Sequence, residues 1–466
     1  MIGNNAFSQS LALTKSQLDN AYTRYKEQAL QSRRFKHSEV VKLLEDHRLA
    51  GTLKIEPIGE SVQKRSIYEV QYGMGNKVVM LWSQMHGDEP TATMALFDVF
   101  NFLTGKADGF DDIRQVLKQQ LDLRFIPMLN PDGAEVYTRR NAQQIDLNRD
   151  ARDTATPEGK LLRSRAETLH PQYGFNLHDQ HIYYNVPGTR NPVTISLLAP
   201  AYNANRDVND VRGNAMKIIV GMEELLQQYI PGAIAKYDDE HSPRAFGDNF
   251  QKWGASTVLI ESGAFKGDPE KQEIRKLNFV MIVHALLQIA QGTYVRYDLK
   301  DYERIPFNAN QLHDIVLRNV SAVAAGLPLQ ADVAIRRDEI TVGRDYYVKG
   351  YVEDIGDLKE FYGYEELDAE GYTLAFGKLY PEQFLHPDQL TKEKIKELLK
   401  SGYSTVLMKE QSDLSTLKLP IRSIHEMGQF RTYSQLRLGQ EATFFLKKGD
   451  SFEYAIINGY LLDLSK

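Results

Sequence analysis

An apolar run that ends in a histidine and a glutamate is the feature that most constrains how this chain can fold. Residues 77–85 are mostly apolar and have the composition of a buried strand. The tetrapeptide His86-Gly87-Asp88-Glu89 follows at once, so an imidazole and a carboxylate lie close together at the expected strand end. Zinc binds His nitrogen and Asp or Glu oxygen, and a catalytic zinc takes three protein ligands. The sequence therefore predicts half of a metal site and requires a third ligand further along.

His178 is the candidate for that third ligand. It follows the apolar segment 174–177, so it is also expected at the end of a strand. His181 is an alternative, but on a continuing strand its side chain would point to the other face. A lone H-x-x-E pair also occurs by chance on many surface helices, so the metal interpretation depends on the rest of the chain.

Composition limits the classes of protein to which the chain can belong. A chain of 466 residues exceeds the usual size of a single core, so two domains are expected. The formal net charge of -6 argues against a dedicated nucleic-acid surface, which is normally basic. Because the chain has no cysteine, a zinc site must consist of histidines and carboxylates.

Neither a signal peptide nor a membrane span is expected. The N-terminus lacks a basic region followed by an apolar stretch. The longest apolar segment, residues 279–290, is interrupted by His284 and Gln288 and is too short to cross a bilayer. We therefore expect a cytoplasmic protein with no membrane or nucleic-acid partner, although a removed leader would leave no trace. The oligomeric state cannot be read from the sequence.

The pattern of elements changes along the chain. Residues 1–48 are predicted to form an N-terminal helical segment, because apolar residues recur there at helical spacing. In residues 49–292, strand-like runs alternate with helical ones, which is typical of an α/β architecture. Residues 293–330 are predicted to be a linker. Short strand-like runs recur in residues 331–466, which we interpret as a β-rich C-terminal domain of unknown role.

Further motifs follow the first pair in a fixed order. An N-P-D-G turn is followed by an R-x-N, a D-L-N-R and a glutamate after the strand 256–260. This ordered set resembles the zinc carboxypeptidases of the M14 family, bacterial-type branch, over about residues 40–292. The resemblance implies an α/β, three-layer catalytic domain with a mixed central β-sheet in residues 49–292. The motif residues are Asn130–Gly133, Arg139, Asn141, Asp146–Arg149 and Glu261.

The resemblance assigns the chemistry to particular side chains. It implies one zinc ion on His86, Glu89 and His178, with Glu261 as the general base for the attacking water. It also implies that Arg139 stabilises the oxyanion that develops on the carbonyl. The neighbouring Arg140 is an alternative, but the spacing to the following asparagine favours Arg139.

The remaining roles concern the substrate and the support of a ligand. Asn148 and Arg149 have donors suited to a free α-carboxylate, and the resemblance implies that they hold one. Tyr237 matches the tyrosine that closes over the substrate, and Asp146 matches the carboxylate that orients the zinc-binding His86. Ordinary structural roles are the alternatives: a helix start for Asn148, a tyrosine packed at a helix end, and an aspartate capping a turn.

The chain also departs from the digestive members of the family. Those carry an arginine between the His and the Glu of the first motif, where this chain has Gly87 and Asp88. His-Gly-Asp-Glu is more similar to bacterial relatives, including N-acyl amino acid deacylases. In the expected side-chain pocket, Asp248 favours a basic substrate and Arg244 favours an acidic one. The sequence therefore does not decide between a basic and an acidic substrate.

The sequence therefore predicts a zinc-dependent hydrolase that cleaves a C-terminal amide (peptide) bond, with a peptide or acyl-amino-acid substrate. An N-acyl amino acid deacylase, or an amidohydrolase acting on a cell-wall stem peptide, is the alternative within the same mechanism. A non-catalytic binding protein that retains the fold is the alternative from another class. Retention of the complete set of predicted metal, base and oxyanion residues argues against it.

Overall fold

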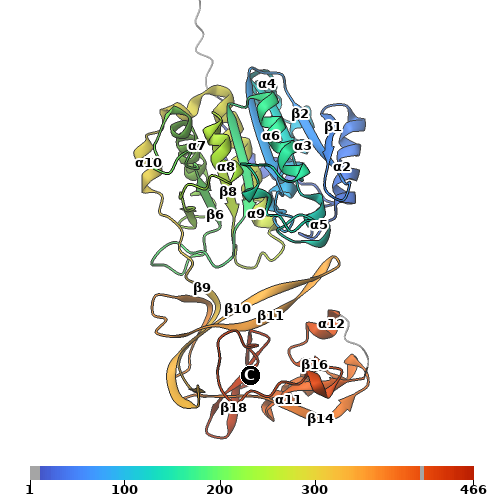
Figure 1. The fold of residues 1–466 in the computed structure, drawn as a ribbon, viewed down its shortest axis with the longest axis vertical. Helices are drawn as coiled ribbons and strands as arrows, with labels where there is room; N and C mark the ends of the chain where they lie inside the picture. Colours follow the sequence, from blue (N-terminus) through green and yellow to red (C-terminus); the bar gives the residue numbers. More distant parts are fainter. Residues whose placement is uncertain (1–10, 410–413, 466) are drawn as a thin grey trace, which may run out of the picture. The chain divides into compact units, whose positions relative to one another are not determined.

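The computed structural model describes residues 11–409 and 414–465. Residues 1–10 of the predicted N-terminal segment, and residues 410–413 and 466 of the predicted C-terminal domain, lie outside these ranges. The chain divides into two compact units, residues 1–309 and residues 310–466 (Figure 1). The first unit is a mixed α/β structure and the second is rich in β-strands.

The first unit is built on an eight-stranded sheet with the order β1-β2-β4-β3-β5-β8-β6-β7. The inner strands β4, β3, β5 and β8 run parallel, whereas β2 and β6 pair antiparallel with them, so the sheet is mixed. Its strands are β1 (Lys54–Glu60), β2 (Ser66–Tyr72), β3 (Lys77–Ser83), β4 (Leu121–Ile126), β5 (Tyr173–Asp179), β6 (Ile195–Leu198), β7 (Ile234–Lys236) and β8 (Ser256–Ser262).

Helices cover both faces of this sheet, as the alternation along β3 shows. Val79 and Leu81 pack in the larger core with α3 and α9, whereas Met80 and Trp82 pack in a second core with α6 and α8. A strand buried on both faces reads as a continuous apolar run, which explains residues 77–85. The helices are α1 (Lys15–Tyr25), α2 (His37–Ala50), α3 (Thr91–Thr104), α4 (Asp111–Gln120), α5 (Pro131–Val136), α6 (Pro157–Leu169), α7 (Asp210–Leu226), α8 (Phe246–Lys252), α9 (Gln272–Gln291) and α10 (Leu299–Arg304).

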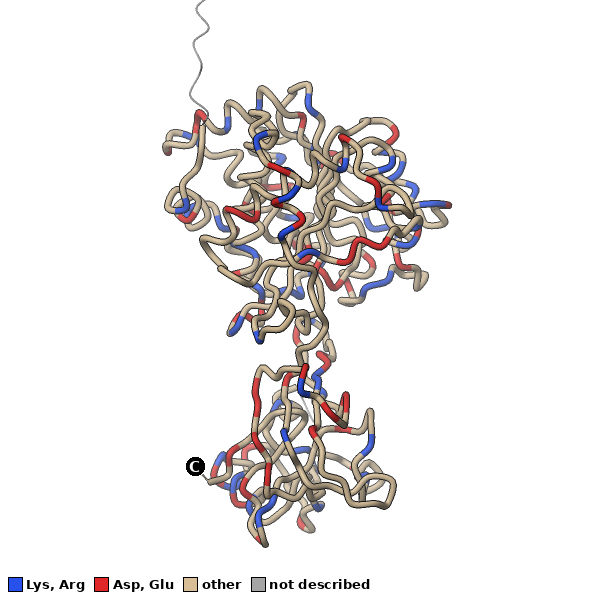
Figure 2. Tube along the Cα trace, turned by 90° about the vertical axis from the view of Figure 1, so that its left-hand side faces the viewer, with Lys and Arg blue, Asp and Glu red and all other residues tan. Residues whose placement is uncertain are grey.

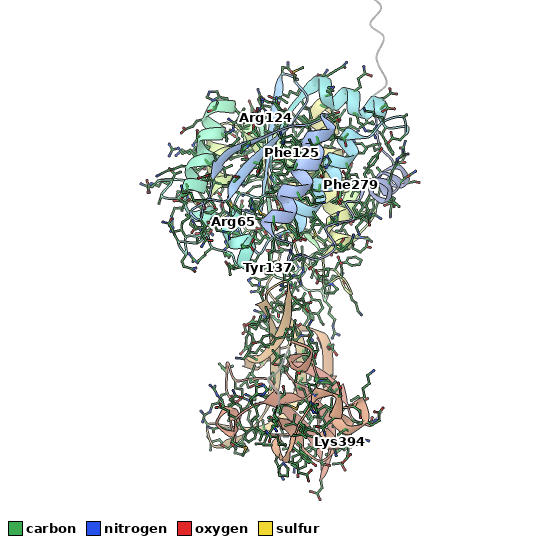
Figure 3. The ribbon with its side chains drawn as sticks, turned by 90° about the vertical axis from the view of Figure 1, so that its right-hand side faces the viewer. Arg65, Arg124, Phe125, Tyr137, Phe279 and Lys394 are labelled. Atoms are coloured by element: carbon green, nitrogen blue, oxygen red, sulfur yellow. The ribbon has the colours of Figure 1, made fainter. Side chains whose placement is uncertain are left out.

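The larger core joins the sheet to its helical layer. Phe125 on β4 and Phe279 on α9 are both fully buried in it, and both are labelled in Figure 3. Leu18 of α1 and Leu44 of α2 belong to the same core. The N-terminal helices are therefore packed into the first unit. The predicted three-layer α/β fold with a mixed central sheet is confirmed.

The N-terminal segment is also fastened by a buried ion pair. Arg275 on α9 binds the carboxylate of Asp98 on α3, and both side chains are fully buried. The same guanidinium donates to the backbone carbonyls of Glu27 and Leu30, in the connection between α1 and α2. One arginine thus holds two core helices and the N-terminal segment together.

The second unit consists mainly of strands, which confirms the predicted β-rich region. One sheet has the order β11-β10-β9-β13-β17-β18-β19, with β12 also paired to β9, and a small sheet has the order β14-β15-β16. The elements are β9 (Leu312–Ala324), β10 (Leu327–Val342), β11 (Asp345–Gly356), β12 (Tyr362–Asp368), β13 (Thr373–Ala375), β14 (Lys378–Phe384), α11 (Lys392–Lys400), β15 (Tyr403–Met408), α12 (Leu414–Leu417), β16 (Arg422–Ile424), β17 (Phe444–Lys448), β18 (Ser451–Ile457) and β19 (Tyr460–Asp463).

The structure differs from the predicted linker at residues 293–330. This stretch holds the 3₁₀ helix η2 (Thr293–Arg296), α10, and β9, which begins at Leu312. Tyr294 and Tyr302 are buried in the core of the first unit, and β9 pairs with β10 and β12. The change of composition after Gly292 therefore marks the end of α9 and not the start of an unstructured connection.

Two general properties bear on the expected partners. Within residues 11–409 and 414–465, no helix combines the length and the apolar composition that a membrane crossing requires. Lys and Arg are interspersed with Asp and Glu along the trace of each unit (Figure 2). This mixed distribution agrees with the small net charge of the chain.

Candidate metal centre

Three neighbouring parallel strands bring the predicted residues to one edge of the sheet. β3 pairs with β5, and β5 pairs with β8, so their carboxyl ends lie side by side. His86 follows β3, His178 lies near the end of β5, and Glu261 lies directly opposite His178 on β8. Ligand sites in open α/β sheets typically lie at this edge.

His86, Glu89 and His178 form a buried cluster with ligand atoms within 4.8 Å of one another. Glu89 Oε1 lies 2.7 Å from His86 Nδ1, and Glu89 Oε2 lies 2.7 Å from His178 Nδ1. The two Nδ1 atoms are 3.2 Å apart. Two imidazole nitrogens and a carboxylate oxygen that converge in this way match the donor set of a catalytic zinc site. His181, the alternative, is exposed and is not part of this cluster.

Asp146 holds the other side of the His86 ring. Its Oδ1 lies 3.0 Å from His86 Nε2 and also accepts a hydrogen bond from the backbone of Asn148. Burial alone would raise the pKa of Asp146, but the hydrogen bond and charge of His86, together with Arg139, lower it. An ionised Asp146 fixes the ring so that Nδ1 faces the cluster. The aspartate therefore caps a turn and orients a ligand at the same time.

Arg139 reaches the cluster and Arg140 does not. Nη1 of Arg139 lies 3.1 Å from Glu89 Oε1, and its Nε lies 3.1 Å from Asp146 Oδ2. The Arg139 side chain keeps 43% of its surface exposed, so it faces both the cluster and the solvent. Arg140 is exposed and donates to the backbone of Gln144. The geometry thus agrees with the choice of Arg139.

The N-P-D-G motif places Arg139 through its asparagine. The Asn130 side chain accepts from Gly133 at the start of α5 and donates to the carbonyls of Met85 and Arg139. The same turn packs tightly against the first motif. A Cβ at Gly87 would lie 2.0 Å from the carbonyl carbon of Gly133, so no larger residue fits at position 87 without moving the backbone.

Glu261 lies in a setting that favours its protonated form. Burial raises the pKa of its carboxyl well above the ordinary value, and the negative charge of Glu89 raises it further. His86 and Arg139 oppose this rise through their positive charges. A raised pKa makes a carboxylate a stronger proton acceptor than an exposed one.

Lys271 and Thr91 contact the site region although no sequence pattern pointed to them. Lys271 Nζ lies 3.1 Å from Asp179 Oδ2 and 2.9 Å from the carbonyl oxygen of Ser262. Thr91 donates to the same carboxylate of Asp179. Asp179 follows His178 and Ser262 follows Glu261, so one ammonium group ties together the two strand ends. A lysine at the start of a helix carries no local signal for such a contact.

The two residues expected to bind an α-carboxylate have different surroundings. Asn148 lies beside the cluster, with Nδ2 3.5 Å from His178 Nε2, and its Oδ1 accepts from the backbone of Phe246. Arg149 is exposed, and its Nη1 donates to the carbonyl of Asn148. Its guanidinium is therefore accessible to a ligand.

Tyr237 follows β7 and contacts a second tyrosine. Its hydroxyl lies 3.3 Å from that of Tyr184, and the two rings meet edge to face at 5.7 Å. Burial raises the pKa of Tyr237, and the charge of Glu261 raises it further, which indicates that the two side chains are near each other. Tyr237 is thus a neutral hydrogen-bond donor at neutral pH.

Asp248 lies in the first turn of α8 and contacts the loop that precedes this helix. Its carboxylate accepts from the backbone of Ser242 and lies 3.2 Å from His241 Nδ1. Burial raises the pKa of Asp248 to about 6, against the opposing effect of these hydrogen bonds. Arg244 donates from Nε to the carbonyl of Arg149. The sequence does not decide whether Asp248 or Arg244 sets the charge of the substrate. The contacts of Asp248 within the protein account for its burial without a substrate.

Comparison with known proteins finds a family model that matches part of this region. Residues 46–184 match the family model of the zinc carboxypeptidases, Peptidase_M14. Over these residues the chain is similar to the zinc carboxypeptidases of the M14 family. The matched range includes His86, Glu89, Arg139 and His178, and it ends before Glu261. Within this range the expected cofactor is zinc, and the buried cluster has suitable ligands.

Individual relatives are distant. Carboxypeptidase SOL1 of Arabidopsis thaliana is 36% identical over 83 residues, which are 17% of this chain and 16% of that protein. A metallo-carboxypeptidase structure from Burkholderia cenocepacia has a TM-score of 0.45 and 15% identity, covering 56% of this chain and 70% of its own. One from Pseudomonas aeruginosa has a TM-score of 0.43 and 17% identity, with coverages of 56% and 70%.

Proposed function

We propose that the first unit removes the C-terminal residue of a peptide by hydrolysing its last peptide bond. The observation that carries this proposal is the buried cluster of His86, Glu89 and His178, with Glu261 directly opposite His178 on the neighbouring strand. The cluster has the ligands for one zinc ion, and Glu261 is a proton acceptor beside it. The proposal thus places metal binding and proton transfer together at the carboxyl ends of β3, β5 and β8.

Each of the three zinc ligands presents particular atoms to the cluster. His86 and His178 present Nδ1, and Glu89 presents both oxygens between them. Bound zinc would lower the pKa of a water molecule and polarise the carbonyl oxygen of the scissile bond. Asp146 keeps His86 in the tautomer that leaves Nδ1 free to act as a ligand.

Glu261 is the proposed general base and general acid. It accepts a proton from the attacking water and delivers this proton to the nitrogen of the leaving amino acid. Its raised pKa supports this role, because a higher proton affinity makes the carboxylate a stronger acceptor for the proton of water. Arg139 stabilises the negative charge that develops on the carbonyl oxygen. Its position 3.1 Å from Glu89 supports this assignment.

Asn148, Arg149 and Tyr237 are proposed to hold the substrate. The accessible guanidinium of Arg149 offers two parallel donors to the α-carboxylate, and Asn148 adds an amide donor next to the cluster. Tyr237 donates from its neutral hydroxyl to the peptide next to the scissile bond. This arrangement restricts cleavage to the end of a chain.

Hydrolysis of an N-acyl amino acid, or of a short stem peptide, is the second candidate. The observation in its favour is Asp88, which replaces the arginine of the digestive enzymes. Burial raises the pKa of Asp88 to about 6, and its Oδ1 is buried with no hydrogen-bond partner. This position therefore offers no fixed cation to an extended peptide, which favours a short substrate.

Blocking the α-carboxylate distinguishes these specificities from generic amide hydrolysis. Conversion of an N-acyl dipeptide to its C-terminal amide is expected to lower kcat/KM by about 10- to 100-fold, because an ion-assisted hydrogen-bond pair is lost. Arg149→Met should impose a similar loss on the free acid and little further loss on the amide. The measurement is a steady-state comparison of the two substrates with both proteins.

Arg152→Met is the matched control, because Arg152 is exposed and lies three positions along the chain from Arg149. It should leave both substrates unaffected. Equal cleavage of acid and amide by the unaltered protein would reject the carboxylate-binding role. Cleavage of N-acyl amino acids but not of dipeptides would favour the deacylase, and turnover of neither by the zinc-loaded protein would favour a binding protein.

A further inference from the structure

The second unit contains a cavity of about 1140 Å³ that the proposed hydrolysis does not use. It lies between the strands β10 and β11, the end of α12, the strand β16 and the irregular segment 425–441. All of its lining residues belong to residues 310–466. Its volume lies just above the usual range of small-molecule sites and is large enough for a short peptide.

Positive side chains outnumber negative ones around this cavity. Arg422 is paired with Glu441 at 3.2 Å and donates to the carbonyl of Gln429. The charged lining residues, besides His425, are Lys349, Arg422, Arg431, Arg437, Asp338 and Glu441. Across the residues that the structure describes, Lys349, Arg431 and Arg437 make no ion pair within 4.0 Å.

Gln440 gives an independent indication of a ligand. It lines the cavity and is only 6% exposed, and neither its Nε2 nor its Oε1 has a hydrogen-bond partner. Its backbone carbonyl accepts from Val352 on β11, so the residue is held in place while its amide is left unpaired. Buried amides are nearly always paired, because an unpaired one destabilises the fold. This side chain lacks one donor and one acceptor.

Aromatic side chains complete the wall. Tyr351 on β11 and Tyr433 in the irregular segment both line the cavity. The Tyr433 ring packs against Phe376 at 5.9 Å between centroids, which fixes its position. Such rings offer flat apolar surface together with a polar hydroxyl, as is common at peptide-binding sites.

We propose that this cavity binds a peptide segment rich in acidic residues. A backbone peptide group has one N–H donor and one C=O acceptor, which is what the Gln440 amide lacks. Carboxylates on the same segment pair with Arg431, Arg437 and Lys349, for which guanidinium and ammonium groups are suited. A phosphate ion would pair with the cations, but it has no apolar surface to place against Tyr351 and Tyr433. An acidic peptide therefore offers partners to the three cations, to the Gln440 amide and to the aromatic rings.

Fluorescence anisotropy on the full chain tests this binding. The probe is fluorescein-Gly-Glu-Tyr-Glu-Ala with an amidated C-terminus, and the matched probe carries Gln in place of both Glu residues. The acidic probe should bind saturably and at least about tenfold more tightly than the neutral one, because its carboxylates form charge-assisted hydrogen bonds. Equal affinity for the two probes, or no saturable binding, would overturn the proposal.

Two double variants distinguish specific binding in the cavity from nonspecific attraction to positive charge. Arg431→Ser with Arg437→Ser should weaken binding of the acidic probe by about tenfold or more. Lys392→Ser with Lys400→Ser removes the same charge from exposed positions on α11 outside the cavity and should leave binding within about twofold. Equal losses in both double variants would show nonspecific attraction and contradict the proposal.

A change at Gln440 tests the amide directly. Gln440→Leu should weaken binding several-fold while leaving the melting temperature the same or higher, because it removes a buried unpaired amide. Unchanged binding in a folded Gln440→Leu variant would contradict the assigned contact. Displacement of the probe by inorganic phosphate, at constant ionic strength and at concentrations where chloride has no effect, would assign the cavity to a phosphate ligand instead.

Discussion

Glu261→Gln is expected to lower kcat on a C-terminal peptide substrate by about 10²- to 10⁴-fold, the usual contribution of a general acid or base. The substitution keeps the size of the side chain and removes its ability to take a proton. Glu261 is not one of the three clustered ligands, so the zinc content should stay close to that of the unaltered protein. KM should change little, because the loss concerns the transition state.

Glu273→Gln is the matched control, since Glu273 lies in the first turn of α9 and is exposed. It should retain full activity. The account is contradicted if Glu261→Gln keeps kcat within about threefold of the unaltered enzyme, because general base catalysis rarely contributes so little. Loss of zinc from Glu261→Gln would place this residue among the ligands and would also contradict the assignment.

Arg275→Met is expected to destabilise the first unit by about 3–5 kcal/mol, because it leaves the buried charge of Asp98 without a partner. Both side chains are 0% exposed. Burial raises the pKa of Asp98 to about 6 even against the opposing effect of Arg275. The carbonyls of Glu27 and Leu30 also lose their donors. The melting temperature should fall on the order of 10 °C.

The double variant Asp98→Leu with Arg275→Met should recover part of this loss, because it removes the unpaired charge together with its partner. Lys276→Met is the control on the same helix. Lys276 forms a partly exposed ion pair with Asp19, so Lys276→Met should lower the free energy of unfolding by less than about 1 kcal/mol. Chemical unfolding provides the measurement, and a loss below about 1 kcal/mol in Arg275→Met would refute the fastening role of this pair.

The metal cluster could be predicted from sequence because its signals are local to strand ends. His86 and His178 each follow an apolar run, and parallel strands place such residues at one edge of the sheet. Which strands are neighbours is not a local property. The ordered motifs supplied that information through the family resemblance, and this is also why Glu261 could be selected from among many glutamates.

Other parts of the structure lack a local signal. Lys271 joins two strand ends through contacts to Asp179 and Ser262, which are set by the packing of α9 on the sheet. The predicted linker was assigned on a change of composition, whereas the burial of Tyr294 and Tyr302 depends on tertiary contacts. The cavity of the second unit is formed largely by an irregular segment, and Gln440 has no periodic pattern around it.

The zinc content of the purified protein tests the central claim most directly. After zinc loading and dialysis against metal-free buffer, the unaltered chain should retain about one equivalent of zinc, as expected for a site with three protein ligands. His178→Ala should retain a small fraction of this amount, while His181→Ala should retain all of it. Absence of zinc from the unaltered protein, or full retention by His178→Ala, would contradict the assignment of the buried cluster as a zinc centre.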